Sequence, residues 1–110
     1  LVAENEIAWI KPAEIKENGI EACIEKIFDT LSHCNYLYVS FDVDSLDTDI
    51  AKATGTPVEG GLKLEQAQIL IDALVSDSRT QCMDITEFNP SLLHPELLLT
   101  AIEKLLRPIL

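Results

Sequence analysis

The fold is decided by the stretch YLYVSFDVDSLD at residues 36–47. Its first six residues are mostly aromatic or β-branched, and their nearly continuous apolar character predicts a strand that is buried on both faces. Acids begin at Asp42, so they follow the carboxyl end of this strand. The next segment, residues 47–62, holds glycine, threonine and proline without periodicity. It predicts a long loop, and long loops inside compact domains are usually functional or mobile.

Apolar residues elsewhere recur with the spacing of helices and strands. Repeats every three or four positions predict amphipathic helices at residues 20–31, 64–75 and 95–109. Asn18 and Glu21 have the spacing of a capping box at the start of the first of these. Short apolar runs predict two more strands, at residues 7–10 and 82–86. Because Pro12 lacks the N–H that strand pairing needs, we expect a turn after residues 7–10.

Strands that alternate with helices predict an α/β fold, in which right-handed crossovers produce a parallel sheet. We expect helices on both faces of this sheet, which gives three layers, α/β/α. Ligands bind beyond the carboxyl ends of the strands in such sheets. Acids follow two of the expected strands, one group starting at Asp42 and another at Glu87. This edge of the sheet is therefore the candidate site.

The composition restricts the classes of function. The chain has 110 residues, a formal net charge of −11 and 47% hydrophobic residues. It is too apolar to be disordered and too acidic to bind nucleic acid or anionic lipid by charge. No apolar run approaches the length of a membrane span, and the first residues lack the layout of a signal peptide. We expect a cytoplasmic protein with no nucleic-acid partner and no membrane partner.

Three cysteines, Cys23, Cys34 and Cys82, are odd in number and widely spaced. This pattern argues against a disulfide framework or a zinc knuckle, and it indicates a reducing compartment. We expect all three to be buried thiols.

Asp42 and Asp44 are two residues apart, and in an extended backbone this spacing puts both carboxylates on one face. Two such carboxylates repel each other unless a cation lies between them, and oxygen ligands favour magnesium, calcium or manganese over zinc. On spacing alone, solvated loop acids are an open alternative. An EF-hand is excluded, because Leu46, Asp47 and Ala53 stand where its loop needs an oxygen ligand, a glycine and a glutamate.

A second class of enzyme also has a DxD pair after an apolar strand. In an aspartyl-nucleophile phosphatase of the haloacid-dehalogenase type, Asp42 would form the phosphoenzyme. The motif of those enzymes continues with Thr or Val, often after Gly, whereas this chain has Ser45 and Leu46. This alternative also gives no role to the threonines and glycines further along the chain.

Two further segments, taken with SFDVDSLD at residues 40–47, carry a resemblance to a known family. Residues 53–62 read ATGTPVEGGL, and residues 84–92 read DITEFNPSL. With this spacing the segments resemble the signature of the ureohydrolase superfamily, which includes arginases, agmatinases and formiminoglutamases, and arginases are the most similar. Residues 7–31 are similar to the strand and helix that precede the signature. The resemblance implies that residues 1–110 are the C-terminal portion of a single three-layer α/β/α domain.

The resemblance implies a role for each matched residue. Asp42 and Asp44 would be ligands of a dinuclear manganese centre, one of them bridging both ions, and Asp47 would be a supporting acid near that centre. Thr56 is similar to the family's threonine on the substrate side. Glu87 is similar to the carboxylate that faces the guanidinium group of the substrate. Three glycines are expected to shape the loop: Gly55, Gly60 and Gly61.

The resemblance also implies the reaction. Two manganese ions lower the pKa of a bridging water, and the hydroxide attacks the guanidinium carbon of a small-molecule substrate. L-Arginine would then give ornithine and urea. Glu87 would hold the planar cation by charge-assisted hydrogen bonds. Agmatine, guanidinobutyrate and formiminoglutamate stay open as substrates, and formiminoglutamate would release formamide in place of urea.

The sequence departs from the family pattern in several places. Thr48 and Lys52 replace prolines, and Lys63 replaces a threonine. His33 and His94 do not lie in the context of the family's metal-binding histidines, so both are expected to be structural or surface residues. The family's GGDH-like and DAHxD-like segments and its acid/base histidine are absent from this sequence. No catalytic residue is therefore assigned, and the isolated chain is expected to be inactive.

A non-catalytic fold remnant or an interaction module is the remaining alternative. Intact acids at Asp42, Asp44 and Glu87 argue against it. The chain begins with Leu1 shortly before a strand-like run, so we expect a fragment of a longer parent. The resemblance implies that the full-length parent is a homo-oligomer, commonly a trimer or hexamer. Three strands of a larger sheet would leave an apolar edge and face uncovered, so we expect the isolated chain to self-associate or to pack against the rest of its parent.

Overall fold

Parallel strands and α-helices make up the chain in the computed structural model, which describes residues 7–51, 55, 59–92 and 94–109. The chain divides into two units, Leu1–Cys34 and Asn35–Leu110. In the part of the chain that is described, no helix has the length and apolar character needed to cross a lipid bilayer.

The first unit contains two helices, α1 (Pro12–Asn18) and α2 (Ile20–Thr30). Proline is favoured at the first position of a helix, where its missing N–H is not needed. The backbone N–H of Lys11, the residue before α1, donates to Oε1 of Glu14 at 3.0 Å, and this hydrogen bond caps the N-terminus of α1. Oε2 of the same glutamate lies 2.8 Å from Nζ of Lys26, so an ion pair joins α1 to α2.

Three expectations for this unit are wrong. Residues 7–10 form no strand, and the side chains of Ile7 and Trp9 are exposed. A strand needs a neighbour that takes up its backbone hydrogen bonds, and in the described sheet β1 and β2 pair only with each other. The expected turn after residues 7–10 is replaced by α1, because Pro12 begins a helix. Asn18 does not cap α2; Gly19, with φ +84°, separates the two helices.

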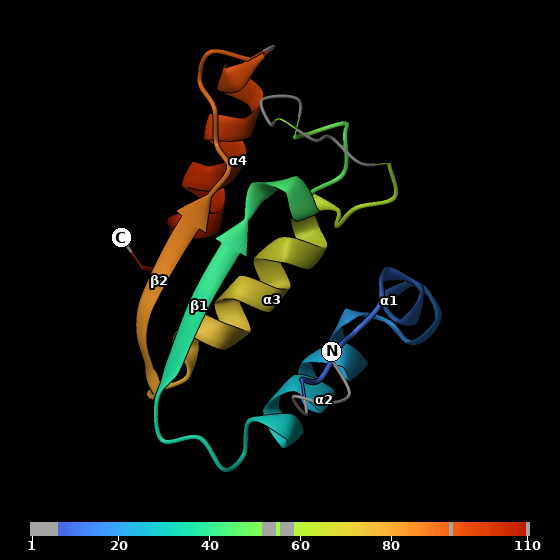
Figure 1. Ribbon diagram of the computed structural model, residues 1–110, viewed down its shortest axis with the longest axis vertical. Coiled ribbons are helices and arrows are strands. Elements are labelled where there is room, and N and C mark those ends of the chain that lie inside the picture. Colours follow the sequence, from blue (N-terminus) through green and yellow to red (C-terminus); the bar gives the residue numbers. More distant parts are fainter. Residues whose placement is uncertain (1–6, 52–54, 56–58, 93, 110) are drawn as a thin grey trace. The chain divides into compact units, whose positions relative to one another are not determined.

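The second unit is built on a parallel pair of strands, β1 (Leu37–Asp42) and β2 (Thr80–Thr86), shown side by side in Figure 1. A short 3₁₀ helix, η1 (Val43–Ser45), follows β1 directly. The connection continues through α3 (Leu64–Ser76), and α4 (Pro95–Leu106) follows β2. A helix between two parallel strands is the crossover that such pairing requires. The predicted α/β class with a parallel sheet is confirmed.

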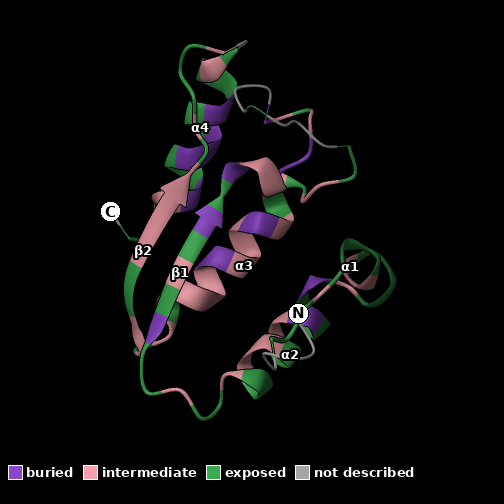
Figure 2. Ribbon diagram, in the orientation of Figure 1, coloured by how far each residue is buried: buried purple, intermediate pink, exposed green. Residues whose placement is uncertain are grey.

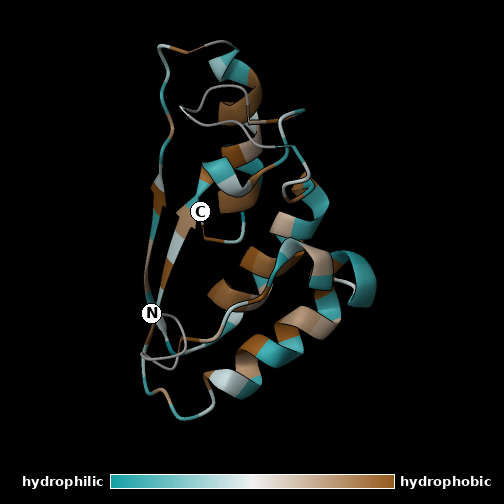
Figure 3. Cartoon of the chain, turned by 45° about the vertical axis from the view of Figure 1, so that its right-hand side comes forward, coloured by the Kyte–Doolittle hydropathy of each residue, from teal (hydrophilic) through white to brown (hydrophobic). Residues whose placement is uncertain are grey.

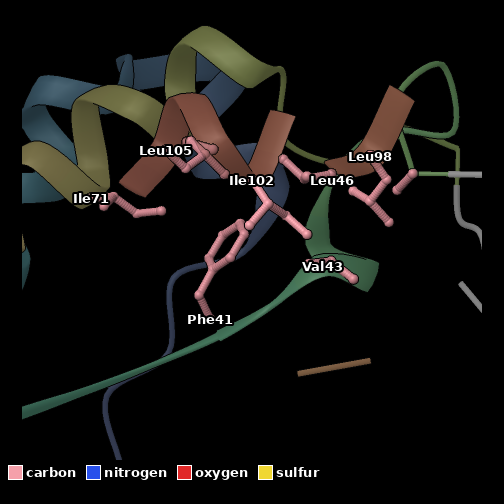
Figure 4. Packing of buried hydrophobic residues seen from close by; sticks show 9 residues of the cluster. Phe41, Val43, Leu46, Ile71, Leu98, Ile102 and Leu105 are labelled. Atoms are coloured by element: carbon pink, nitrogen blue, oxygen red, sulfur yellow. The ribbon is translucent and has the colours of Figure 1, made fainter. Parts of the chain in front are cut away.

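The core of this unit forms where α3 and α4 pack against one face of the sheet. Phe41 is buried between side chains of both helices, and Figure 4 shows Ile71, Ile102 and Leu105 near its ring. Figure 2 shows the buried residues recurring along the inner sides of β1, α3 and α4. Bands of hydrophobic and hydrophilic residues alternate along the helices in Figure 3, as expected for amphipathic helices with one face in a core.

The second face of the sheet does not match the prediction of a strand buried on both sides. Tyr38 is 61% exposed, and Ser40 and Asp42 on the same face are also exposed. Cys82, the register partner of Tyr38, is exposed as well, so the expectation of three buried thiols holds for Cys23 and is wrong for Cys82. Cys34 is half-buried. Successive side chains of a strand point to opposite faces, and α3 and α4 cover the face that carries Phe41.

The turn from α3 to β2 is held by one charged pair. Oδ1 of Asp77 accepts hydrogen bonds from the backbone N–H and the Nε–H of Arg79, and Oδ2 lies 2.8 Å from Nη2. These hydrogen bonds from Arg79 lower the pKa of the Asp77 carboxyl to about 2. The carbonyl of Arg79 then accepts from Leu37 N–H at 2.8 Å, which joins the turn to the start of β1.

We predict that Asp77→Asn weakens the fold at neutral pH and reduces its acid sensitivity. The folded carboxyl has a lowered pKa, so its stabilising contribution is present above pH 4 and is lost as pH falls toward about 2. Urea unfolding at pH 7 and at several values from pH 5 to 3 should show a flatter pH dependence in the variant. Glu103→Gln on the exposed side of α4 is the control, and an identical slope in wild type and Asp77→Asn would contradict the prediction.

Candidate functional site

Acidic residues from two distant parts of the sequence meet at the carboxyl edge of the sheet. Asp42 ends β1 and pairs in register with Thr86, which ends β2. Glu87 is the next residue, so its carboxylate is attached one position beyond the partner of Asp42. In parallel α/β sheets ligands bind beyond this edge.

The DxD pair adopts a tighter geometry than the extended one predicted for it. The backbone turns into η1 after Asp42, and Oδ1 of Asp42 accepts the backbone N–H of Asp44 at 2.8 Å. Ser45 Oγ donates to the carbonyl of Asp42 at 2.6 Å. Val43, between the acids, is fully buried in the core and anchors the turn. The prediction of an extended DxD is wrong, because the buried Val43 and the short hydrogen bonds favour a 3₁₀ turn.

The two carboxylates match the donor chemistry of manganese without completing a site. Oxygen ligands suit manganese, magnesium and calcium. Asp42 is exposed beyond the strand end, and Oδ1 of Asp44 is buried within the turn. Within the described ranges, no group of three or more His, Cys, Asp or Glu side chains is placed to hold a metal ion. Any complete metal centre therefore needs further ligands from elsewhere.

Glu87 has an unusual backbone conformation. Its φ is +67°, in the left-handed region that residues with a Cβ rarely occupy, and its side chain is exposed. Such conformations cost free energy and cluster at functional sites. Sequence patterns give no signal for this feature, because the residue type is neither glycine nor asparagine. Glu87 as a substrate-binding residue stays a prediction, and its backbone is a reason to test it.

The three predicted loop glycines differ in whether the backbone conformation and the neighbouring atoms would tolerate a side chain. Gly60 has φ +79°, and a Cβ on Gly61 would lie 2.7 Å from the backbone carbon of Leu46. Gly55 has no positive φ, and among the described residues no heavy atom lies within 4 Å of the place a Cβ would take. Thr56 lies outside the described residues.

Asp47 lies at the base of the same loop. It is 7% exposed and is the buried charged residue of the core region. The pKa of its carboxyl is lowered by a hydrogen bond from the Asp49 backbone N–H and then by Lys63 and the Gly60 N–H. No contact among the described residues tests the predicted role of Asp47 as an acid that supports the metal centre, so that role stays a prediction.

Sequence reasoning missed a hydroxyl–carboxylate cluster on the exposed face of the sheet. Tyr38 and Ser40 of β1 both donate to Asp84 of β2, and the Ser40 bond is 2.7 Å long. These bonds, Tyr38 first, lower the pKa of the Asp84 carboxyl, and the pKa of Tyr38 is raised in return. Asp42 continues the same face toward the carboxyl edge. The period-two spacing of Tyr38, Ser40 and Asp42 was the available signal, but the register with β2 was not readable from sequence.

Both histidines make contacts with residues close to them in the sequence. His33 is exposed in the turn after α2, with Nε2 3.8 Å from Sγ of Cys34. His94 precedes α4 with φ +54°, and its Nδ1 lies 3.2 Å from Oε1 of Glu96. These contacts are local in sequence, as expected for residues with structural or surface roles.

The structure defines the class of fold, an α/β unit with carboxylates at the ends of its parallel strands, and comparison with known proteins identifies the family. The model of the Arginase family matches residues 1–108. The chain belongs to the arginase family.

Individual relatives agree with this assignment. The arginase of Emericella nidulans is 33% identical over 92 residues, which are 84% of this chain and 28% of that protein. The crystal structure of arginase from Bacillus cereus superposes with a TM-score of 0.90 at 26% identity, over 98% of this chain and 37% of that one. Entamoeba histolytica arginase in complex with L-ornithine gives 0.84 at 25% identity, over 96% and 37%. The chain thus spans less than a third of the curated relatives that it matches.

We predict that Gly61→Ala destabilises the second unit and that Gly55→Ala does not. The added methyl on residue 61 meets backbone atoms of residues 45–47, which cannot move aside like a flexible side chain. We expect a loss of about 1–3 kcal/mol for Gly61→Ala. The described residues leave room for a Cβ on Gly55, which predicts a change within about 0.5 kcal/mol. Urea unfolding midpoints measure both, and equal midpoints for the two variants would count against this packing.

Proposed function

We propose that this chain is the C-terminal portion of a single arginase-like domain that hydrolyses L-arginine to ornithine and urea with manganese. The observation that carries the proposal is the strand register, in which Asp42 and Thr86 are partners and Glu87 follows. This register brings the carboxylates assigned to metal and to guanidinium to one edge of the sheet. Membership of the arginase family and the L-ornithine bound to the Entamoeba histolytica relative support the same substrate class.

Asp42 and Asp44 would hold the manganese ions through carboxylate oxygens, together with ligands from outside this chain. When bound, manganese supplies Lewis-acid activation of water. The 3₁₀ turn fixes the spacing of these two carboxylates, because the Asp44 N–H is bonded to Oδ1 of Asp42 and Val43 is locked in the core. Oδ2 of Asp42, which has no hydrogen-bond donor among the described residues, would bind a cation at the strand end.

Glu87 would bind the substrate cation. A carboxylate accepts two parallel N–H hydrogen bonds from a planar guanidinium, which fixes both the position and the plane of the group. The left-handed backbone of Glu87 sets the direction in which its side chain leaves β2. Holding the reacting carbon in place in this way lowers the entropic part of the barrier. A cluster of carboxylates at this edge also attracts a cationic substrate.

We propose a cellular setting from the composition alone. Three free cysteines are consistent with a reducing compartment, and we place the protein in the cytoplasm. The parent is proposed to be a homo-oligomer, a trimer or hexamer, as the family resemblance implies.

The decisive experiment compares the longest natural protein that contains this chain with the 110-residue chain alone. The longer protein should release urea and ornithine from L-arginine when Mn²⁺ is supplied. The short chain should release none, because its described residues hold too few metal ligands. Agmatine and formiminoglutamate are assayed in parallel. Faster turnover of agmatine would reassign the substrate, formamide release would indicate the formimino member, and urea release by the short chain would contradict the need for outside ligands.

We predict that Glu87→Gln in the longer protein lowers kcat/KM for L-arginine about 10- to 100-fold, the loss expected for a hydrogen bond to a charged group. Bound manganese, measured by elemental analysis, should stay at the wild-type level. Asp42→Asn should instead reduce bound manganese. Glu103→Gln, on the exposed side of α4, is the matched control with wild-type activity. Wild-type kinetics in Glu87→Gln would remove Glu87 from the substrate site.

A further inference from the structure

Asp47 binds both ends of the loop that spans residues 47–63. Its Oδ1 accepts the backbone N–H of Asp49 at 3.2 Å, at the beginning of the loop. Its Oδ2 accepts the backbone N–H of Gly60 at 3.2 Å and lies 3.2 Å from Nζ of Lys63, both at the end of the loop. A single buried carboxylate therefore joins the beginning of the loop to its end, and its bond to Gly60 spans 13 residues of sequence.

The backbone of Asp47 makes the same connection. Its N–H donates to the carbonyl of Leu62 at 2.9 Å, and its carbonyl accepts the N–H groups of Ile50 and Ala51, each at 3.0 Å. Leu62 N–H donates to the carbonyl of Ser45 at 2.8 Å, completing a short parallel bridge. The close approach of Gly61 to this bridge leaves no room for a Cβ. The carboxylate, the backbone N–H and the carbonyl of Asp47 thus all make hydrogen bonds at the loop base, by which we mean residues 45–47 and 60–63.

Lys63 adds a charge to this base and links it to α3. It is the residue before α3, and its backbone N–H donates to Oε1 of Gln66 at 3.0 Å. Its side chain is 60% exposed and the Asp47 side chain is 10% exposed, so the ion pair joins a solvent-exposed group to a buried one. Salt screens the exposed charge of Lys63, because at 1 M ionic strength charges separated by more than about 3 Å are largely screened. The hydrogen bonds that the backbone N–H groups of Asp49 and Gly60 donate to Asp47 do not depend on the charge of Lys63.

The hydrogen-bond partners of the Asp47 carboxylate differ from those of the Asp42 carboxylate. Leu46 and Val43 are both fully buried in the core. Leu46 directly precedes Asp47 and also forms the bridge with Leu62. The carboxylate of Asp47 contacts residues that follow it in the chain, whereas Asp42 contacts the backbone of Asp44. The Asp47 carboxylate therefore bonds across the loop, and the Asp42 carboxylate bonds within the 3₁₀ turn.

We propose that Asp47 is a positioning residue, which fastens the two ends of the loop that carries Thr56, and that Lys63 makes this fastening sensitive to salt. The role of Thr56 rests on the proposed function, whereas the fastening itself rests on contacts within residues 45–51 and 59–63. Asp47 thereby acts on substrate binding through the loop and leaves manganese binding to Asp42 and Asp44.

The fastening is tested in the 110-residue chain by amide hydrogen exchange followed by NMR. Asp47→Asn should accelerate exchange of the Gly60 N–H about 10- to 100-fold, as expected for the loss of one hydrogen bond to a charged acceptor. Asp49→Asn, whose exposed side chain makes no bond to the loop base, is the matched control. Lys63→Thr should give a smaller acceleration, and the difference from wild type should vanish in 1 M NaCl; Lys104→Thr controls for the lost charge. Wild-type exchange in both Asp47→Asn and Lys63→Thr would overturn the proposal.

The positioning role is tested in the longest natural protein that contains this chain. Asp47→Asn should raise KM for L-arginine about tenfold while bound manganese stays at the wild-type level. A loss of bound manganese would overturn the proposal and make Asp47 a supporting acid of the metal centre. If the wild-type protein releases no urea, the proposed function fails, and the exchange of the Gly60 N–H still decides whether Asp47 fastens the loop.

Discussion

Parallel pairing of β1 with β2 brings together residues that are 44 positions apart, such as Ser40 and Asp84. Each strand sends one set of side chains into the core under α3 and α4, and the opposite set forms a polar face that leads to Asp42. If the register moved by one residue, Phe41 would lose its buried neighbours and Asp42 would no longer lie beside Thr86. Core packing therefore holds the carboxylates at the strand ends in their relative places.

Much of the second unit was readable from sequence because its periodic patterns are strong. The predicted helix at 64–75 matches α3 (Leu64–Ser76), and the predicted strand at 82–86 lies within β2 (Thr80–Thr86). The first unit was harder. Residues 7–10 are apolar but pair with no strand in the described part of the chain, and Pro12 begins a helix where a turn was expected. An apolar run reports a tendency to be buried, and it does not reveal whether a partner is present.

The candidate site was predicted in outline and missed in detail for a physical reason. Asp42, Asp44 and Glu87 stand out because acids follow apolar strands. The 3₁₀ turn between the first two depends on the burial of Val43, and the left-handed backbone of Glu87 depends on how the chain leaves β2. The partners of Asp47 lie up to 16 residues away, at Lys63. Such contacts arise from tertiary packing, which local patterns do not encode.

The closed base at residues 45–47 and 60–63 also affects how this family of sequences can diverge. Backbone bonds and one carboxylate fix where residues 48–59 leave and rejoin the fold. Lengthening a loop between fixed ends costs little, since closure entropy grows only with the logarithm of its length. Ala51 is itself buried in the core with residues of β1, η1 and α3, so insertions are expected to accumulate after it, between residues 51 and 59. A duplicated gene could acquire a new substrate preference in this segment while it inherits the same sheet and the same carboxylates.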